Sequence, residues 1–146
     1  YMLARIYFRA IISVKPYMPA EKNPTLDALL KTLADRTRLR LLNLMGDHEI
    51  CVCFLVEGLK TSQPKISRHL AYLRRSGLVA ARREGLWMHY RINRPKDTNL
   101  ACVLDSVLQS ATRDPEMKRD LARFNSACCA PKLITLQRAP APAPVN

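Results

Sequence analysis

The first regular apolar spacing in the chain begins at residue 26. Four leucines there follow the i, i+3, i+4, i+7 spacing that places side chains on one face of a helix: Leu26, Leu29, Leu30 and Leu33. Thr25 precedes them and has a side chain suited to capping a helix N-terminus. The pattern therefore predicts an amphipathic helix that begins after Thr25.

Two further helices are predicted before residue 60. Asp35 is a suitable N-cap for a helix over residues 36–45, which is rich in leucine and is followed by Gly46 as a stop signal. A third, short helix is expected over about residues 51–57, with Gly58 marking its end. The three predicted helices follow one another through short connections.

The next predicted helix covers residues 62–76 and has two different faces. Ser62 is its N-cap, and Pro64 lies in the first turn, where a missing N–H costs nothing. Gly77 is its stop signal. One face carries Ile66, Leu70 and Leu73. The opposite face carries Lys65, Arg68, His69 and Arg75.

The period of the pattern changes after this helix. Residues 78–83 and 87–92 read as two short strands of a hairpin that carries arginines. Asp97 is then expected to cap a helix with apolar spacing from residue 100 to 111, and residues 116–127 form a further short helix. The predicted fold is mainly α with one small β-hairpin.

The length of 146 residues suits one compact domain. Three prolines in residues 16–24 indicate an extended linker, so residues 1–24 are assigned to an N-terminal extension. Residues 25–112 form the predicted domain. Residues 113–146 form a cysteine-containing tail, whose end is rich in Ala and Pro and is expected to be disordered.

Several features bear on where the protein works. The sequence begins with Tyr1, and Met18 is a candidate start, which leaves open whether residues 1–17 are native. No apolar run reaches the ~18–20 residues of a membrane span, and no secretory signal peptide is recognised. The cysteines are odd in number, in CxC and CC spacings that disfavour disulfides: Cys51, Cys53, Cys102, Cys128 and Cys129. We expect a reducing, cytoplasmic setting and no membrane partner.

The positive charge of the chain is concentrated in one segment. The formal net charge is +12, and nine basic residues against one acid give +8 between Lys60 and Arg94. A basic segment of this kind favours an anionic partner, and nucleic acid above all. No phosphate loop and no paired acid–base motif point to an enzyme.

The helices at 51–57 and 62–76, with their short connection, have the proportions of a helix-turn-helix. The second helix of such a unit enters the major groove and reads bases near its N-terminus. The candidate base contacts are Gln63, Lys65, Ser67, Arg68 and His69. The hairpin that follows is predicted to serve as a wing, with Arg82 and Arg83 contacting phosphate or the minor groove.

Three segments resemble the ArsR/SmtB family of winged-helix metalloregulatory repressors, in particular its arsenic-responsive type. They are LADRTRLRLLNLM at 33–45, SQPKISRHLAYLRRSGLV at 62–79 and REGLWMHYRI at 83–92. The resemblance implies a homodimeric winged helix-turn-helix, joined through the helix near the N-terminus and the helix after the wing. It also implies that the ion-free dimer represses by binding double-stranded operator DNA and leaves it when an ion binds.

The segment EICVC at 49–53 resembles the thiolate site of that family. Phe54 and Val56 depart from the arsenic-responsive motif, and Val56 stands where a third cysteine is expected. Arsenite is a soft centre that we expect to take three sulfurs. Cys128 and Cys129 are therefore predicted to complete the metal site, in their own protomer or in the other. Cys102 is expected to be structural or incidental.

On a regular helix, side chains at positions i and i+2 point in different directions. Binding of one ion by both Cys51 and Cys53 is therefore expected to distort the first turn of the helix. Because that helix positions the recognition helix, such a distortion is a candidate switch.

Other effectors remain open at this point. Antimonite and organoarsenicals share the chemistry of arsenite, and four thiolates would suit Cd, Pb or Zn. Residues 96–115 contain no histidine, so the zinc site that the family carries on the helix after the wing is expected to be absent. A thiol redox switch is the remaining alternative.

Overall fold

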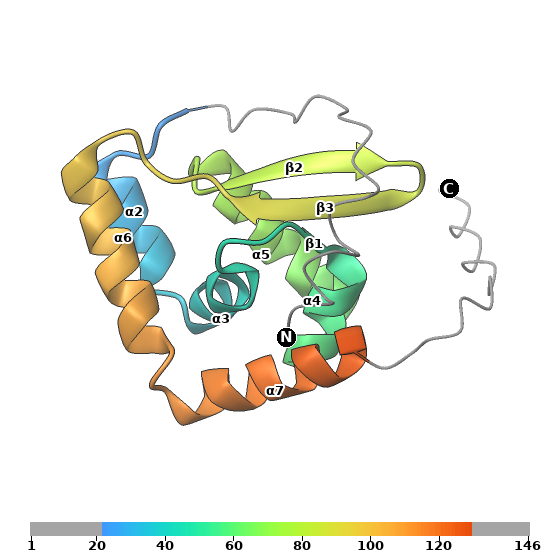
Figure 1. Cartoon of the computed structure of the whole chain (residues 1–146). Helices are drawn as coiled ribbons and strands as arrows, with labels where there is room; N and C mark the ends of the chain where they lie inside the picture. Colours follow the sequence, from blue (N-terminus) through green and yellow to red (C-terminus); the bar gives the residue numbers. More distant parts are fainter. Residues whose placement is uncertain (1–21, 130–146) are drawn as a thin grey trace.

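The computed structural model describes residues 22–129 (Figure 1). Within this range, six helices and three short strands follow the order α2, α3, β1, α4, α5, β2, β3, α6, α7. The helices are α2 (Leu26–Leu33), α3 (Arg36–Met45), α4 (Val52–Leu59), α5 (Gln63–Arg75), α6 (Thr98–Ala111) and α7 (Pro115–Cys129). The strands are β1 (Ile50–Cys51), β2 (Val79–Glu84) and β3 (Trp87–Ile92).

Side chains at three helix starts make the predicted caps. The hydroxyl of Thr25 accepts from the backbone N–H of Ala28 at 3.3 Å at the start of α2. The carboxylates of Asp35 and Asp97 accept from backbone N–H groups in the first turns of α3 and α6. These bonds satisfy donors that a helix start leaves without partners. The predicted helices at 26–33 and 36–45 are confirmed.

The start of α4 differs from the prediction. Ile50 and Cys51 form the short strand β1, which pairs antiparallel with Tyr90 and His89 of β3. Cys51 is the N-cap of α4 in an extended conformation, so the helix begins at Val52 instead of residue 51. A strand of two residues has no periodicity that a sequence pattern can reveal, and its pairing depends on a wing 40 residues further along.

The sheet has the strand order β1–β3–β2, and all its pairs are antiparallel. The hairpin β2–β3 turns at Gly85, which has a positive φ of 59°. Arg82 pairs with His89, which in turn pairs with Cys51, so one row of residues crosses all three strands. Since paired residues in an antiparallel sheet share a face, the wing and the start of α4 are joined through this row.

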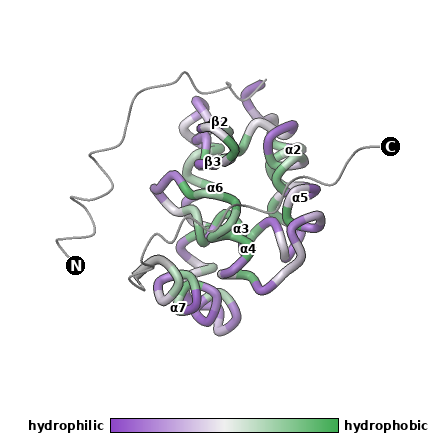
Figure 2. The backbone as a smooth tube through the Cα atoms, turned by 90° about the vertical axis from the view of Figure 1, so that its right-hand side faces the viewer, coloured by the Kyte–Doolittle hydropathy of each residue, from purple (hydrophilic) through white to green (hydrophobic). Residues whose placement is uncertain are grey.

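The core lies where the helices meet under the sheet. Leu41, Leu42, Leu55, Ile66 and Leu70 are all fully buried. Figure 2 shows hydrophobic segments gathered around α3, α4 and α6, with hydrophilic turns toward the outside. The apolar positions predicted for the helices therefore provide the packing that holds α5 and the wing in place.

Helix α7 is longer than predicted and packs along α4 and α3 (Figure 1). The carboxylate of Asp114 accepts from the N–H groups of Glu116 and Met117 and caps the helix. Pro115 opens α7, a position that suits proline because it needs no N–H donor. The predicted boundary after residue 112 thus falls in the turn between α6 and α7.

Residues 1–21 and 130–146 lie outside the described part of the chain, and the predictions for the linker and the Ala/Pro-rich end fall mostly on them. The side chains of residues 128 and 129 also lie outside it. None of the helices in residues 22–129 combines the length and the apolar character needed to cross a membrane.

Candidate nucleic-acid interface and thiol pair

The outer face of α5 carries most of the predicted base contacts. Ile66, Leu70 and Leu73 are buried and attach the helix to the core. The positions between them face solvent: Gln63, Lys65, Ser67 and Arg68 are all exposed. Four of the five residues predicted to read bases are therefore brought together on one accessible helix face.

His69 is the exception on α5. Its side chain is 19% exposed, and its Nδ1 lies 3.5 Å from a carboxylate oxygen of Asp35, the N-cap of α3. This places His69 beside α3, behind the exposed face. The contact favours a role in holding α5 against α3 over a direct contact with a base.

A cation–π contact holds the C-terminal half of α5 against α3. The guanidinium of Arg38 lies 4.2 Å from the centroid of the Tyr72 ring. Its Nε also donates to the backbone oxygen of Thr32 at 2.9 Å. Cation–π contacts of this kind add to the apolar packing. Arg38 thus links α5 to both α2 and α3.

The two arginines of the wing have opposite surroundings. Arg83 is exposed, and its Nε donates to the backbone oxygen of Gly85 at 3.0 Å. The side chain of Arg82 is only 8% exposed and donates to Glu49 at 2.6 and 2.9 Å. The hydrogen bond to Glu49 raises the pKa of Arg82, and Glu84 lies 2.8 Å from the same guanidinium.

The prediction that Arg82 contacts DNA assumed an exposed side chain, and the structure shows it turned into the protein. Counting charges along the sequence could not reveal this. Glu49 lies outside the basic segment at 60–94 and reaches Arg82 only through the pairing of β1 with β3.

The thiols of Cys51 and Cys53 lie in contact. Their Sγ atoms are 3.0 Å apart, longer than the ~2.05 Å of a disulfide bond. The expectation that the two side chains diverge is wrong. That expectation required both residues in the helix, whereas Cys51 has extended backbone angles (φ −67°, ψ 143°) and only Cys53 lies in α4. One ion can therefore contact both sulfurs without unwinding the first turn.

The environment of the pair is asymmetric. Cys51 is buried and Cys53 is exposed. Contact with Cys53, followed by burial, raises the pKa of the Cys51 thiol. Thiolates are the ligands that soft ions prefer, so two sulfurs in contact are chemically suited to a soft ion. Among the described side chains, no group of three or more His, Cys, Asp or Glu is arranged to hold a metal ion.

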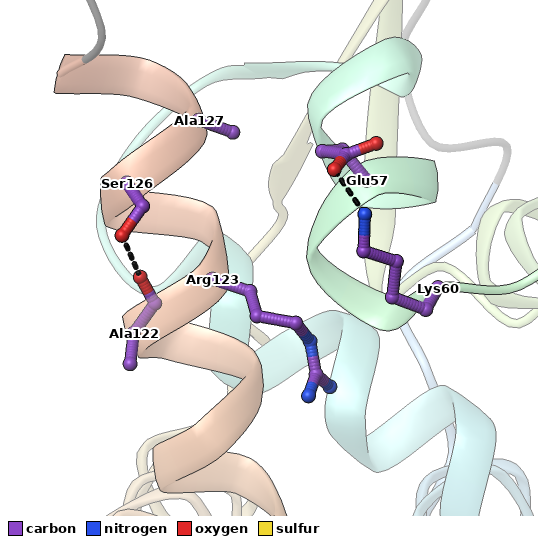
Figure 3. Close-up of a pocket in the computed structure, with 6 residues that line it drawn as sticks. All are labelled: Glu57, Lys60, Ala122, Arg123, Ser126 and Ala127. Carbon is purple, nitrogen blue, oxygen red and sulfur yellow. Dashed lines mark hydrogen bonds and ion pairs between the residues drawn. The ribbon is translucent and has the colours of Figure 1, made fainter.

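The remaining cysteines lie on two other helices. Cys102 is exposed on α6. Cys128 and Cys129 form the last two residues of α7. Between α7 and α4 lies an open hollow, which Figure 3 shows from the side. It is lined by Glu57, Lys60, Ala122, Arg123, Ser126 and Ala127.

Comparison with known proteins agrees with this arrangement. Residues 35–81 match the family described as bacterial regulatory protein, arsR family. The chain is 43% identical over 99 residues to an arsenical resistance operon repressor of Escherichia coli (strain K12), which covers 66% of this chain and 85% of that repressor. It is 50% identical over 66 residues to the arsenic resistance transcriptional regulator ArsR1 of Pseudomonas putida, covering 44% of this chain and 52% of that regulator.

A solved structure supports the same fold. HlyU from Vibrio cholerae N16961 aligns with a TM-score of 0.50 and 33% sequence identity, over 60% of this chain and 87% of HlyU. Together with the helix pair α4–α5 and the hairpin β2–β3, this similarity confirms the predicted winged helix-turn-helix.

Proposed function

Because this chain belongs to the arsR family of bacterial regulatory proteins and is a transcriptional regulator with no enzymatic role, we propose that it is a homodimeric, arsenite-responsive repressor in the cytoplasm. It binds double-stranded operator DNA in its ion-free form and leaves the DNA when arsenite binds its thiolates. The observation that carries this proposal is the contact of two sulfurs at the start of the helix that precedes the recognition helix.

The exposed face of α5 supports the proposed DNA contact. Gln63 suits adenine, and Lys65 and Arg68 suit guanine, in the major groove. The exposed guanidinium of Arg83 in the wing suits a phosphate. Arg82 and His69 hold the wing and α5 in position behind this surface. Arg82 does so through its contact with Glu49, and His69 through its contact with Asp35.

Two apolar surfaces support the proposed dimer. On α2, Leu26 is 54% and Leu30 is 51% exposed. On α6, Val103 and Val107 are only half-buried within one chain. A second copy that covers α2 and α6 would remove this apolar area from water, which is the main driving force for association. A dimer also presents two recognition helices to a two-fold symmetric operator.

The thiol pair supplies the proposed effector site. Cys51 and Cys53 hold two bonds to arsenic, and a third thiolate comes from the pair Cys128–Cys129. Cys51 ends β1 and caps α4, and α4 leads to α5 through only three residues. A shift of Cys51 on binding is therefore passed to α5 through α4 and to the wing through β3.

Release of DNA by different ions tests this function. A duplex selected from random sequences by the protein itself provides the probe, and fluorescence anisotropy follows its release by arsenite, antimonite, Cd, Pb and Zn in parallel. We expect arsenite and antimonite to release the DNA at the lowest concentrations. Serine variants of Cys51 and Cys53 should stay bound, and Cys102→Ser is the matched control that should respond like the wild type.

Two outcomes would contradict this function. Release by Cd or Pb with no response to arsenite would assign the site to a four-thiolate ion. Release by peroxide in metal-free buffer, reversed by a reductant, would assign it to thiol oxidation.

A further inference from the structure

We propose that an ion pair between Glu49 and Arg82 carries the arsenite response from the thiol pair to the wing. This inference rests on the proposed release by arsenite and deepens it, because it names the residues that link the ion to the DNA contact. Two routes lead away from Cys51, one through α4 and one through β1. The larger share of the response passes through β1. Glu49 and Arg82 are then positioning residues, which act between Cys51 and Arg83.

The ion pair joins the two outer strands of the sheet across the strand between them. Glu49 directly precedes β1, Arg82 belongs to β2, and β3 lies between β1 and β2. The Oε1 atom of Glu49 accepts from Nε of Arg82 at 2.9 Å and from its Nη2 at 2.6 Å. Figure 1 shows β1 where the sheet meets the start of α4. The pair therefore connects the thiol-bearing end of the sheet with the wing.

This contact is shielded from solvent. The side chain of Arg82 is 8% exposed and that of Glu49 is 21% exposed. The ring of His89 lies beside the pair, but its Nδ1 is 3.7 Å from Oε1 of Glu49, which is longer than either contact of Arg82. Separation of the pair would leave a guanidinium in the protein interior without Glu49 as its partner, and such a loss is strongly unfavourable. Arg82 is therefore expected to follow a displacement of Glu49.

Glu49 is also closely linked to the thiol pair. Only Ile50 separates it from Cys51, and both residues of β1 are buried. Cys51 pairs with His89 of β3, which in turn pairs with Arg82 of β2. Cys51 and Arg82 thus lie in the same row across the sheet. A movement of Cys51 displaces Glu49 through the two residues of β1.

Ion binding requires the two sulfurs of the thiol pair to move apart. They lie 3.0 Å from each other. Bonds of about 2.3 Å from one ion, meeting at an angle of about 90° or more, hold two sulfurs at least about 3.2 Å apart. Because Cys51 belongs to β1 and Cys53 to α4, this opening pushes the strand and the helix away from each other.

The helix is held more firmly than the strand. Leu55 of α4 is fully buried in the core, and Nε of Arg123 in α7 donates to the backbone oxygen of Gly58 at 3.0 Å. By contrast, β1 has two residues and, in the sheet that the structure describes, pairs with β3 alone. Elements with few stabilising contacts are the ones that open most easily. The opening of the thiol pair is therefore expected to displace β1 more than α4.

Arg82 is adjacent in sequence to the proposed phosphate contact of the wing. Neighbouring residues of a strand point to opposite faces. Arg82 is accordingly buried and Arg83 is exposed, although both belong to β2. When Arg82 follows Glu49, the backbone that carries Arg83 moves with it, and the guanidinium of Arg83 leaves its phosphate. The link thus runs from the ion through Cys51, Glu49 and Arg82 to Arg83.

The change in DNA affinity caused by arsenite measures this link. The dissociation constant of the selected duplex is determined by fluorescence anisotropy with and without saturating arsenite, for full-length wild type, Glu49→Gln, Arg82→Gln and Glu84→Gln. If arsenite weakens binding by wild type about 100-fold, it should weaken binding by Glu49→Gln and Arg82→Gln less than about tenfold. Glu84→Gln is the matched control and should keep the full wild-type factor. It loses a carboxylate 2.8 Å from the same guanidinium, but Glu84 belongs to β2 itself.

A double variant distinguishes one shared contact from two independent effects. Glu49→Gln combined with Arg82→Gln should respond to arsenite like either single variant, because both changes break the same contact. In the absence of DNA, all variants should bind arsenite within about twofold of wild type, read from ultraviolet thiolate–arsenic absorption. A purely structural role of the pair would leave the arsenite factor of every variant at the wild-type value.

Two results would overturn the inference. An arsenite factor in Arg82→Gln equal to that of wild type would assign the response to α4. Loss of arsenite binding by Arg82→Gln without DNA would show that the pair builds the thiolate site itself. Glu49→Gln answers the same question if Arg82→Gln fails to fold. Wild type that binds the duplex but is not released by arsenite would instead contradict the proposed function.

Discussion

The cations of α5 and those of α3 and β2 carry the same charge in opposite surroundings. Lys65 and Arg68 on α5 are exposed and have no ion pair with any residue in the described range. Arg40 of α3 and Arg82 of β2 are turned inward, toward Asp120 and Glu49. The first group is available to an anionic partner, whereas the second holds secondary-structure elements together.

This difference reduces the positive charge that the basic segment at 60–94 presents to solvent. Within the basic segment at 60–94, Lys60 pairs with Glu57, Arg82 with Glu49 and Glu84, and Arg94 with Asp47 and Asp105. Most of these acids lie outside the basic segment. The positive surface is therefore narrower than the +8 of the sequence, and it is centred on α5.

The largest effect is expected for the buried cluster. Asp120→Asn removes the buried carboxylate that pairs with both Arg40 and Arg123, while Arg40 keeps its ion pair with Glu116. The free energy of unfolding should fall by about 3 kcal/mol, measured by urea denaturation. Asp27→Asn removes an exposed ion pair with Lys31 and should leave the midpoint of the urea denaturation curve unchanged. If the two variants behaved alike, the inward cations would have no structural role.

The next effect concerns base reading by the outward cations. Arg68→Ala should cost about 2 kcal/mol of binding to the preferred duplex and relax preference at one base position. Competition binding with duplexes substituted at single positions measures this. Arg75 lies on the same helix near its C-terminal end, and Arg75→Ala should weaken all duplexes to a similar extent. Equal loss of preference in both variants would contradict base reading by Arg68.

The two wing arginines provide the most direct comparison of outward and inward cations. Arg83→Gln should reduce the slope of log affinity against log salt by about 1, because one phosphate contact is lost. Arg82→Gln should leave the slope unchanged and lower the free energy of unfolding by about 1 kcal/mol. A changed slope for Arg82→Gln would show that its guanidinium leaves Glu49 on binding DNA.

The smallest effect is a pH dependence at the start of α7. A hydrogen bond from Arg36 lowers the pKa of Asp114. A carboxylate whose pKa is depressed by folding stabilises the protein above its unfolded pKa of about 3.9 and loses this contribution as pH falls toward the folded value. Below about pH 4, wild type should therefore lose stability more steeply than Asp114→Asn. Arg36→Gln should flatten the profile in the same way, and a steeper profile for either variant would contradict this sign.

The sequence predicts local features of this fold well and tertiary ones poorly. The bounds of α2 and α3 could be predicted because Thr25 and Asp35 cap helices through side chains that lie next to them. Strand β1 could not, since Ile50 and Cys51 become a strand only by pairing with β3. The start of α7 at Pro115 was missed because the sequence does not show that Asp114 caps the helix.

In the candidate site, too, the features set by local sequence could be predicted and those set by tertiary contacts could not. The exposure of Gln63, Lys65 and Arg68 follows from helical period alone, because Ile66 and Leu70 occupy the buried face. The burial of Arg82 and the contact of the Cys51 and Cys53 sulfurs both depend on β1. The sequence places Cys51 and Cys53 in one helix, whereas in the structure Cys51 ends β1 and Cys53 lies in α4.

Gly58 has a consequence for how this regulator can change by mutation. A methyl group at this position would lie 2.8 Å from Leu44 Cδ1 and 3.3 Å from the Cβ of Phe124, so α7 would have to shift slightly away from α4. If the pair Cys128–Cys129 supplies the third thiolate, such a mutant retains every cysteine and the whole face of α5, yet the end of α7 that carries this pair is displaced relative to the other two sulfurs. A lineage without arsenic could lose sensing in one step at Gly58 while it keeps repression, and reversal of the same codon would restore sensing.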